Sequence, residues 1–110
     1  MNFNDLTIGQ AKQLADMFTK DTDPGPWEIG ANYLIRTVTM TLTGRLVSVY
    51  PQELMLQDAA WIADTGRFAN AVEMSSFEEV EPFPEGRIVG VGRGAVVDFC
   101  KITTLPRSQK

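Results

Sequence analysis

Residues 32–60, NYLIRTVTMTLTGRLVSVYPQELMLQDAA, decide the fold of this 110-residue chain. Threonine stands at every second position from Thr37 to Thr43, and β-branched residues in such alternation favour one long strand, from Tyr33 to Thr43. Gly44 indicates either a sharp bend or a close approach of two strands, and Pro51 indicates a turn. The stretch therefore predicts three consecutive strands in a strongly bent sheet that closes toward a small barrel.

A helix is expected before these strands, over residues 7–19. Thr7 and Gln10 have the spacing of a capping box, and apolar side chains recur behind them at helical intervals. A chain of this length is close to the common size of one domain, so we expect residues 1–110 to form a single domain.

The closing part of the predicted barrel lies in residues 87–103, which read as two short strands on either side of Arg93. With residues 31–60 they predict a mainly β (α+β) fold, in which the helix precedes a five-stranded antiparallel barrel. Residues 61–86 between the two parts are predicted to be a long loop between strands 3 and 4, which is usually functional or mobile. Residues 104–110 are expected to be a frayed tail.

The composition argues against catalysis. The chain has no histidine and one cysteine, Cys100, which removes Ser-His and Cys-His nucleophile pairs and a structural zinc site. No clustered aspartate motif supports bound magnesium. We therefore expect no enzyme activity, no cofactor and no metal site, and we interpret Cys100 as a small buried hydrophobic residue.

The net charge and the hydropathy of the chain restrict the kinds of binding partner that we expect. A net charge of −4 disfavours nucleic acid, whose binding requires a basic surface. No apolar run approaches the roughly 20 residues of a membrane span, and the N-terminus lacks the regions of a signal peptide. We expect a cytosolic protein without a membrane partner. Five of the six arginines lie between Arg36 and Arg93, which is compatible with a local anion site.

The segment WIADTGRF has the side chains of a nucleotide site. Aromatic faces stack on bases, arginine binds phosphate in bidentate fashion, and Asp or Thr can hold ribose or base edges. The candidate ligand-binding residues in this segment are Trp61, Asp64, Thr65, Arg67 and Phe68. The alternative is an Asp-Thr-Gly turn in which the Asp carboxylate caps the local backbone, while the two aromatic rings fill one end of the barrel.

Arg36 and Arg93 are further candidates for contact with a ligand. Arg36 lies on the apolar face of the longest predicted strand, and a buried arginine needs a partner. That partner is either Asp98, in VVDFC, or a ligand anion. Glycines on both sides of Arg93 permit the close approach of a ligand or a neighbouring subunit, and a plain hairpin turn is the alternative.

Gly44, Leu46 and Val49, followed later by Arg93 and Gly94, resemble the pattern of Sm-like barrels, which share the small SH3-like barrel shape. That pattern is an N-terminal helix, a Gly-x-Leu-x-x-hydrophobic bend, and a late Arg-Gly step between two short strands. The resemblance implies an RNA-binding ring, although the Asp and Asn of the family's base pocket are absent from this sequence.

The segments IRTVTM, TGRLV, DAAWIADTGRF, EPFPEG and VGRGAVVD are similar to an uncharacterised family of small proteins of tailed phages and prophages. The resemblance implies a viral accessory protein in the cytoplasm of the bacterial host. We therefore expect a counter-defence protein that sequesters a small anionic nucleotide-type immune signal of the host in an Arg/aromatic pocket.

We also expect self-association, and two alternative functions stay open. Open barrels expose edge strands, so we expect a homo-oligomer between a dimer and a hexamer. One alternative function is inhibition of a host enzyme, as a protein partner, through the acidic residues 73–85, which otherwise form a solvated surface. The other alternative is the Sm-like RNA-binding ring.

Overall fold

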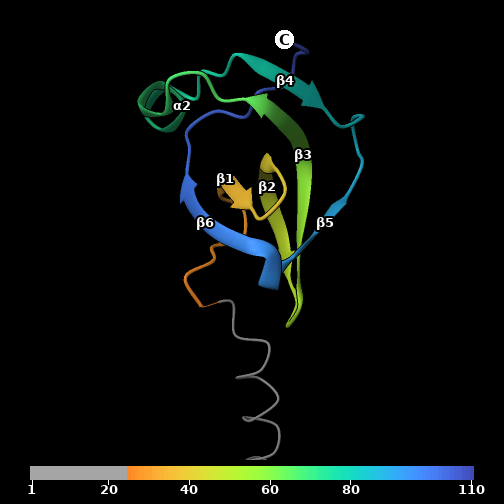
Figure 1. The fold of residues 1–110 in the computed structure, drawn as a ribbon. Helices are drawn as coiled ribbons and strands as arrows, with labels where there is room; N and C mark the ends of the chain where they lie inside the picture. The colour runs from red at the N-terminus through yellow and green to blue at the C-terminus, as the bar shows by residue number, and fades with distance from the viewer. Residues whose placement is uncertain (1–24) are drawn as a thin grey trace, which may run out of the picture.

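The computed structural model describes residues 25–110, so the helix predicted over residues 7–19 lies outside the described residues. The described part is mainly β, with one short α-helix (Figure 1). Its elements are β1 (Asn32–Thr37), β2 (Thr41–Val49), β3 (Glu53–Asp64), α2 (Phe68–Met74), β4 (Glu79–Pro82), β5 (Val89–Gly92), the 3₁₀ turn η2 (Arg93–Ala95) and β6 (Val96–Lys101).

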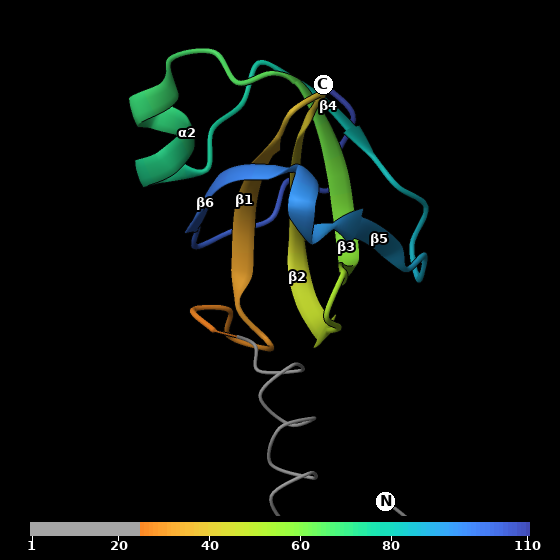
Figure 2. The same cartoon turned by 60° about the horizontal axis from the view of Figure 1, so that its bottom comes forward.

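All of these strands belong to one six-stranded antiparallel sheet with the order β4-β3-β2-β1-β6, while β5 pairs with β3. The long strand β3 pairs with β5 along its first half and with β4 along its second half. The segment β5–η2–β6 therefore crosses from β3 to β1 (Figure 2). The prediction of a mainly β fold is confirmed. The predicted five-stranded barrel differs from the structure, because β4 and β6 end the sheet without pairing with each other.

The first turn of the sheet lies earlier than predicted. β1 ends at Thr37, and the chain reverses before β2 begins, so the threonine-rich run is two strands and not one. The hydroxyl oxygen of Thr37 accepts hydrogen bonds from the backbone N–H groups of Thr39, at 3.3 Å, and Met40, at 3.0 Å. A threonine side chain that bonds the backbone in this way competes with a continuing strand and favours a turn.

Gly44 lies inside β2, where the pairing with β3 shifts register between Thr43 and Arg45. A Cβ atom at this position would lie 3.0 Å from Cβ of Leu56 and 3.4 Å from Cβ of Ala59. The missing side chain therefore lets β3 pack closely on β2, which is the second of the two roles predicted for this glycine.

Two hydrophobic clusters cover opposite faces of the sheet, because successive side chains of a strand alternate between its faces. The first contains Trp27, Tyr33, Ile35, Leu42, Leu46, Leu54, Leu56, Ala59 and Val91. The second contains Leu34, Ala60, Ile62, Ala71, Phe77, Val80 and Ile102. Ala71 belongs to α2, so the helix packs on the face of the second cluster.

Residues 61–86 are more regular than the predicted long loop. They contain the end of β3, the helix α2 and the strand β4. Phe68–Met74 within this range is helical. Part of the acidic stretch 73–85 forms strand β4 of the sheet. Val80, which lies between two glutamates of this strand, is buried in the second cluster and anchors β4.

Residues 104–110, which we predicted to be a frayed tail, make hydrogen bonds to the rest of the described fold. The guanidinium group of Arg107 donates hydrogen bonds to the carbonyl oxygens of Ala59, at 2.7 Å, and Phe83, at 3.0 Å. The backbone of Lys110 exchanges two hydrogen bonds with Val80, at 2.9 and 3.1 Å. Charge-assisted hydrogen bonds and an extra pairing along the outer side of β4 therefore fix the tail.

Replacing Arg107 with alanine should release this tail. The loss of two charge-assisted hydrogen bonds to backbone carbonyls should reduce the free energy of unfolding by about 1–2 kcal/mol. Hydrogen exchange should then speed up at the amides of Val80 and Lys110, and urea unfolding gives the change in stability. Arg87→Ala, in the loop before β5, is the matched control. Equal effects of the two substitutions would show that the Arg107 contacts do not hold the tail.

Candidate functional site

The predicted site residues are placed by different elements. Arg36 lies on β1, Trp61 and Asp64 lie on β3, Thr65 and Arg67 lie in the turn that follows, Phe68 begins α2, and Arg93 lies in η2.

Arg36 and Phe68 come together between β1, β6 and α2. The guanidinium carbon of Arg36 lies 4.8 Å from the centroid of the Phe68 ring, which is the geometry of a cation–π contact. Both side chains line a cavity of about 290 Å³. The other lining residues are Leu34, Val72, Asp98, Phe99 and Cys100.

Arg36 is paired with Asp98, as one of the two sequence-based alternatives predicted. The two residues stand opposite each other in the β1–β6 register. Nε of Arg36 donates to Oδ1 of Asp98 at 2.7 Å, and Nη2 donates to Oδ2, so the pair is bidentate. The prediction that Arg36 is buried is wrong, because its side chain is 45% exposed and that of Asp98 is 47% exposed. A pair this exposed adds little to stability but fixes the position of the guanidinium group.

These contacts shift the pKa values of the ionisable side chains that line the cavity. The hydrogen bond from Arg36 lowers the pKa of Asp98, and the same bond raises the pKa of Arg36. Burial raises the pKa of the Cys100 thiol, and the negative charge of Asp98 raises it further. At neutral pH the cavity therefore holds an ion pair beside a protonated thiol. A thiol in that state is a poor nucleophile, so Cys100 serves as part of the apolar wall.

Acid should weaken the Arg36–Asp98 pair. The pKa of Asp98 in the folded protein lies below its ordinary value of 3.8, so its carboxylate stabilises the folded state above that value. This contribution disappears as the pH falls through the folded-state pKa. Asp98→Asn should therefore lose less stability than the wild type between about pH 5 and about pH 2. Urea unfolding across this range gives the slopes, with Glu85→Gln in the loop after β4 as control. The same acid slope in Asp98→Asn as in the wild type would rule out this linkage.

The Asp64-Thr65-Gly66 segment at the end of β3 forms a tight turn, which is the alternative to a nucleotide site that the sequence allowed. Oδ1 of Asp64 accepts a hydrogen bond from the backbone N–H of Gly66 at 2.8 Å, and the hydroxyl of Thr65 donates to the Gly66 carbonyl at 3.2 Å. Gly66 has a φ of +67°, and a Cβ there would lie 2.5 Å from Cγ of Glu78. Asp64 and Thr65 therefore shape the turn that leads into α2, which puts Phe68 over β1.

Trp61, Arg67 and Arg93 do not line the cavity. Trp61 is 45% exposed and stands opposite Glu81 of β4. Arg67, also exposed, is the residue before α2. Nη1 of Arg93 donates to the carbonyl oxygen of Tyr50 at 3.0 Å, so this arginine joins η2 to the β2–β3 turn. The predicted arginines therefore do not converge on one hollow.

The apolar walls of the cavity were missed as site residues in the sequence. Leu34 and Arg36 share one face of β1, and Asp98 and Cys100 share the same face of β6, because alternate residues point the same way. The alternation in IRTV and VVDFC contains this signal. It becomes readable only once the β1–β6 register is known.

No family model, no curated protein and no solved structure matches this chain. The resemblances to phage proteins and to Sm-like barrels therefore stay predictions. Within residues 25–110 no helix has both the length and the apolar character needed to cross a membrane. In the same residues, no three Cys, Asp or Glu side chains are grouped so as to hold a metal ion.

Proposed function

We propose that this protein is a non-enzymatic binding protein that holds a small nucleotide-type ligand in the cavity between β1, β6 and α2. The observation that carries the proposal is the meeting of an aromatic face and a fixed guanidinium group at one apolar hollow. Phe68 supplies the ring and Arg36 the cation, 4.8 Å apart.

The cavity suits the base of such a ligand. Its volume of about 290 Å³ is close to the lower end of the range for small-molecule pockets, roughly 300–1,000 Å³. The walls formed by Leu34, Val72 and Cys100 offer apolar contact to a flat ring. Phe68 is 45% exposed, so part of this residue is accessible to a base, although Arg36 lies over one face of the ring.

The guanidinium group of Arg36 suits the phosphate. An arginine has five N–H donors, and the pair with Asp98 uses Nε and Nη2. The remaining donors can therefore bind an anion while the ion pair stays intact. Because Asp98 already neutralises the charge, the stacked ring should contribute more affinity than the phosphate.

The biological setting of the proposal comes from the resemblance to tailed-phage proteins. We propose that the protein acts in the cytoplasm of the bacterial host and sequesters a nucleotide immune signal. Sequestration needs affinity and no catalysis, which agrees with the absence of histidine from the sequence. We also propose that it forms a homo-oligomer, because β6 has β1 as its one partner in the described sheet and keeps an open edge.

Thermal unfolding with a panel of nucleotides tests the function. The panel contains AMP, a cyclic mononucleotide, a cyclic dinucleotide and ADP-ribose, with adenosine and inorganic phosphate as controls for the two halves of the ligand. A true ligand at about 100 times its Kd should stabilise the protein by roughly 2.7 kcal/mol. Adenosine should retain part of this effect and phosphate little of it. A panel in which no compound raises the unfolding temperature would refute the proposed function.

A further inference from the structure

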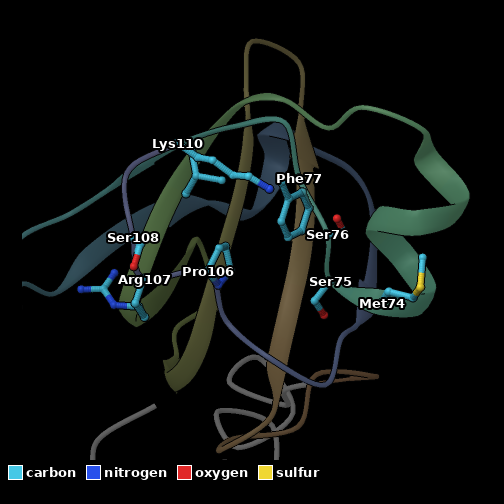
Figure 3. Close-up of a pocket in the computed structure, with 9 residues that line it drawn as sticks. Met74, Ser75, Ser76, Phe77, Pro106, Arg107, Ser108 and Lys110 are labelled. Carbon is cyan, nitrogen blue, oxygen red and sulfur yellow. The ribbon is translucent and has the colours of Figure 1, made fainter.

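The two ends of the six-stranded sheet differ in how their outer edges are covered. At the β4 end, the backbone of Lys110 exchanges hydrogen bonds with Val80, at 2.9 and 3.1 Å. Figure 3 shows Lys110 together with Arg107 and Ser108 of the same C-terminal segment. At the other end, β1 is the one partner of β6, so no strand of residues 25–110 pairs with the outer edge of β6. The chain therefore covers one end of its sheet and leaves the other open.

The backbone of β6 offers hydrogen bonds at this open edge. The N–H of Ile102 donates to the carbonyl oxygen of Asn32 at 3.0 Å, so Ile102 bonds toward β1. In an antiparallel pair, successive residues of a strand bond alternately to one side and to the other. Cys100 therefore also bonds toward β1, while the N–H and C=O groups of Phe99 and Lys101 point outward. An exposed strand edge of this kind is a template for pairing with another strand.

The charged side chains of β6 do not protect this edge. Proteins commonly block an open edge with unpaired charges or with proline, and β6 contains no proline. Asp98 is neutralised by its pair with Arg36. Lys101 is neutralised in the same way by Glu28. Val97 of the same strand is 64% exposed. A strand that approaches β6 therefore meets no uncompensated charge and can gain an apolar contact.

From this edge we propose that the protein forms a dimer with twofold symmetry, in which β6 pairs antiparallel with β6 of a second copy. Identical antiparallel strands present the same outward groups to each other, so the edge is complementary to itself. The inference deepens the homo-oligomer proposed above, because it names the interface, and it requires no ligand in the nucleotide cavity.

The twofold axis lies at Phe99. Outward-bonding residues must face each other, and this register overlaps the largest part of β6. The Phe99 residues of the two copies exchange a pair of backbone hydrogen bonds. Asp98 stands opposite Cys100 of the second copy. Lys101 stands opposite Val97 of that copy, where the aliphatic stem of the lysine covers the valine. No like charges are therefore directly opposed, as a stable pair of strands requires.

Disulfide formation in Asp98→Cys tests this register. Positions 98 and 100 of the two copies face each other without hydrogen bonds between them, where Cα atoms lie about 4.5 Å apart. This separation falls within the range of disulfides, about 4.4–6.8 Å. Under oxidation the introduced cysteine should link to Cys100 of the second copy, giving a covalent dimer whose linked peptides mass spectrometry identifies. Val97→Cys should give no more covalent dimer than the wild type. Equal yields from the two variants, or a link between two introduced cysteines, would overturn the proposal.

Sedimentation of the full chain without nucleotide tests the interface itself, so its outcome does not depend on the proposed ligand. The wild type should sediment as a dimer. Lys101→Pro should raise the dissociation constant of the dimer roughly tenfold or more, because each copy loses an outward N–H donor. Lys101→Gln removes the charge but keeps the N–H group, so it should leave the dimer intact.

Gly92→Pro is the control for the other open strand, β5. The N–H of Arg93 donates to the carbonyl oxygen of Gln52 at 2.9 Å, so that of Gly92 points away from β3. Gly92 has a φ of −66° and no heavy atom within 4 Å of an added Cβ, so proline fits there. This variant should remain a dimer. A monomeric wild type would overturn the proposal, and so would dissociation of Gly92→Pro, which would place β5 in the interface.

Discussion

Replacing Leu56 with alanine is expected to lower the free energy of unfolding by about 2–5 kcal/mol. Leu56 is fully buried in the first cluster, at the centre of the sheet. It stands opposite Leu46 of β2 and Val89 of β5, and its side chain fills the space left by Gly44. Truncation therefore opens a cavity where three strands meet. Against a typical total stability of about 5–15 kcal/mol, this is a severe loss.

Urea unfolding measures this effect, with Val97→Ala as the control. Val97 is an apolar residue of β6 that is 64% exposed, so its truncation should change stability by no more than about 0.5 kcal/mol. A loss below about 1 kcal/mol for Leu56→Ala would contradict the packing of β2, β3 and β5 around this side chain.

Replacing Phe68 with alanine should weaken the binding of a nucleotide-type ligand by roughly 5- to 150-fold. This range corresponds to the stacking contribution of about 1–3 kcal/mol per base. The reason is that the ring forms the open stacking face of the cavity beside Arg36. Because Phe68 is 45% exposed at the first position of α2, its removal should change the stability of the fold much less than the loss of Leu56.

Trp61→Ala is a matched control for this substitution, since Trp61 is an aromatic residue with the same exposed fraction of 45%. It does not line the cavity, so its removal should leave the affinity unchanged. Calorimetric titration with AMP compares the two variants. Equal losses in both, or a loss in Trp61→Ala alone, would place the ligand away from the proposed cavity.

The strands were largely predictable from the sequence, whereas their ends were not. Alternating threonines predict extended backbone, but they do not show where one strand ends and the next begins. The turn after β1 depends on the hydroxyl of Thr37 bonding the backbone of Met40, a local choice that alternation does not reveal. The docking of the tail depends on Arg107 reaching the carbonyl oxygen of Ala59, far away in the sequence. The short tail, residues 104–110, contains no sequence pattern that predicts such a contact.

The part of the candidate site that depends on the alternation of side chains along strands was predictable from the sequence. Arg36 and Asp98 stand opposite each other in neighbouring strands, as the sequence pattern allowed. Trp61 does not line the cavity, although it is only seven residues from Phe68 in the sequence. Its neighbours Ala60 and Ile62 pack in the cluster beneath α2, so Trp61 between them points to the opposite face of β3.

Intermolecular nuclear Overhauser effects between AMP and the protein test the central claim most directly, namely that the cavity between β1, β6 and α2 receives the base. We expect cross-peaks from the purine protons to the ring of Phe68 and the methyl groups of Val72 and Leu34. Cross-peaks to Trp61 instead, or none at saturating AMP, would contradict the claim.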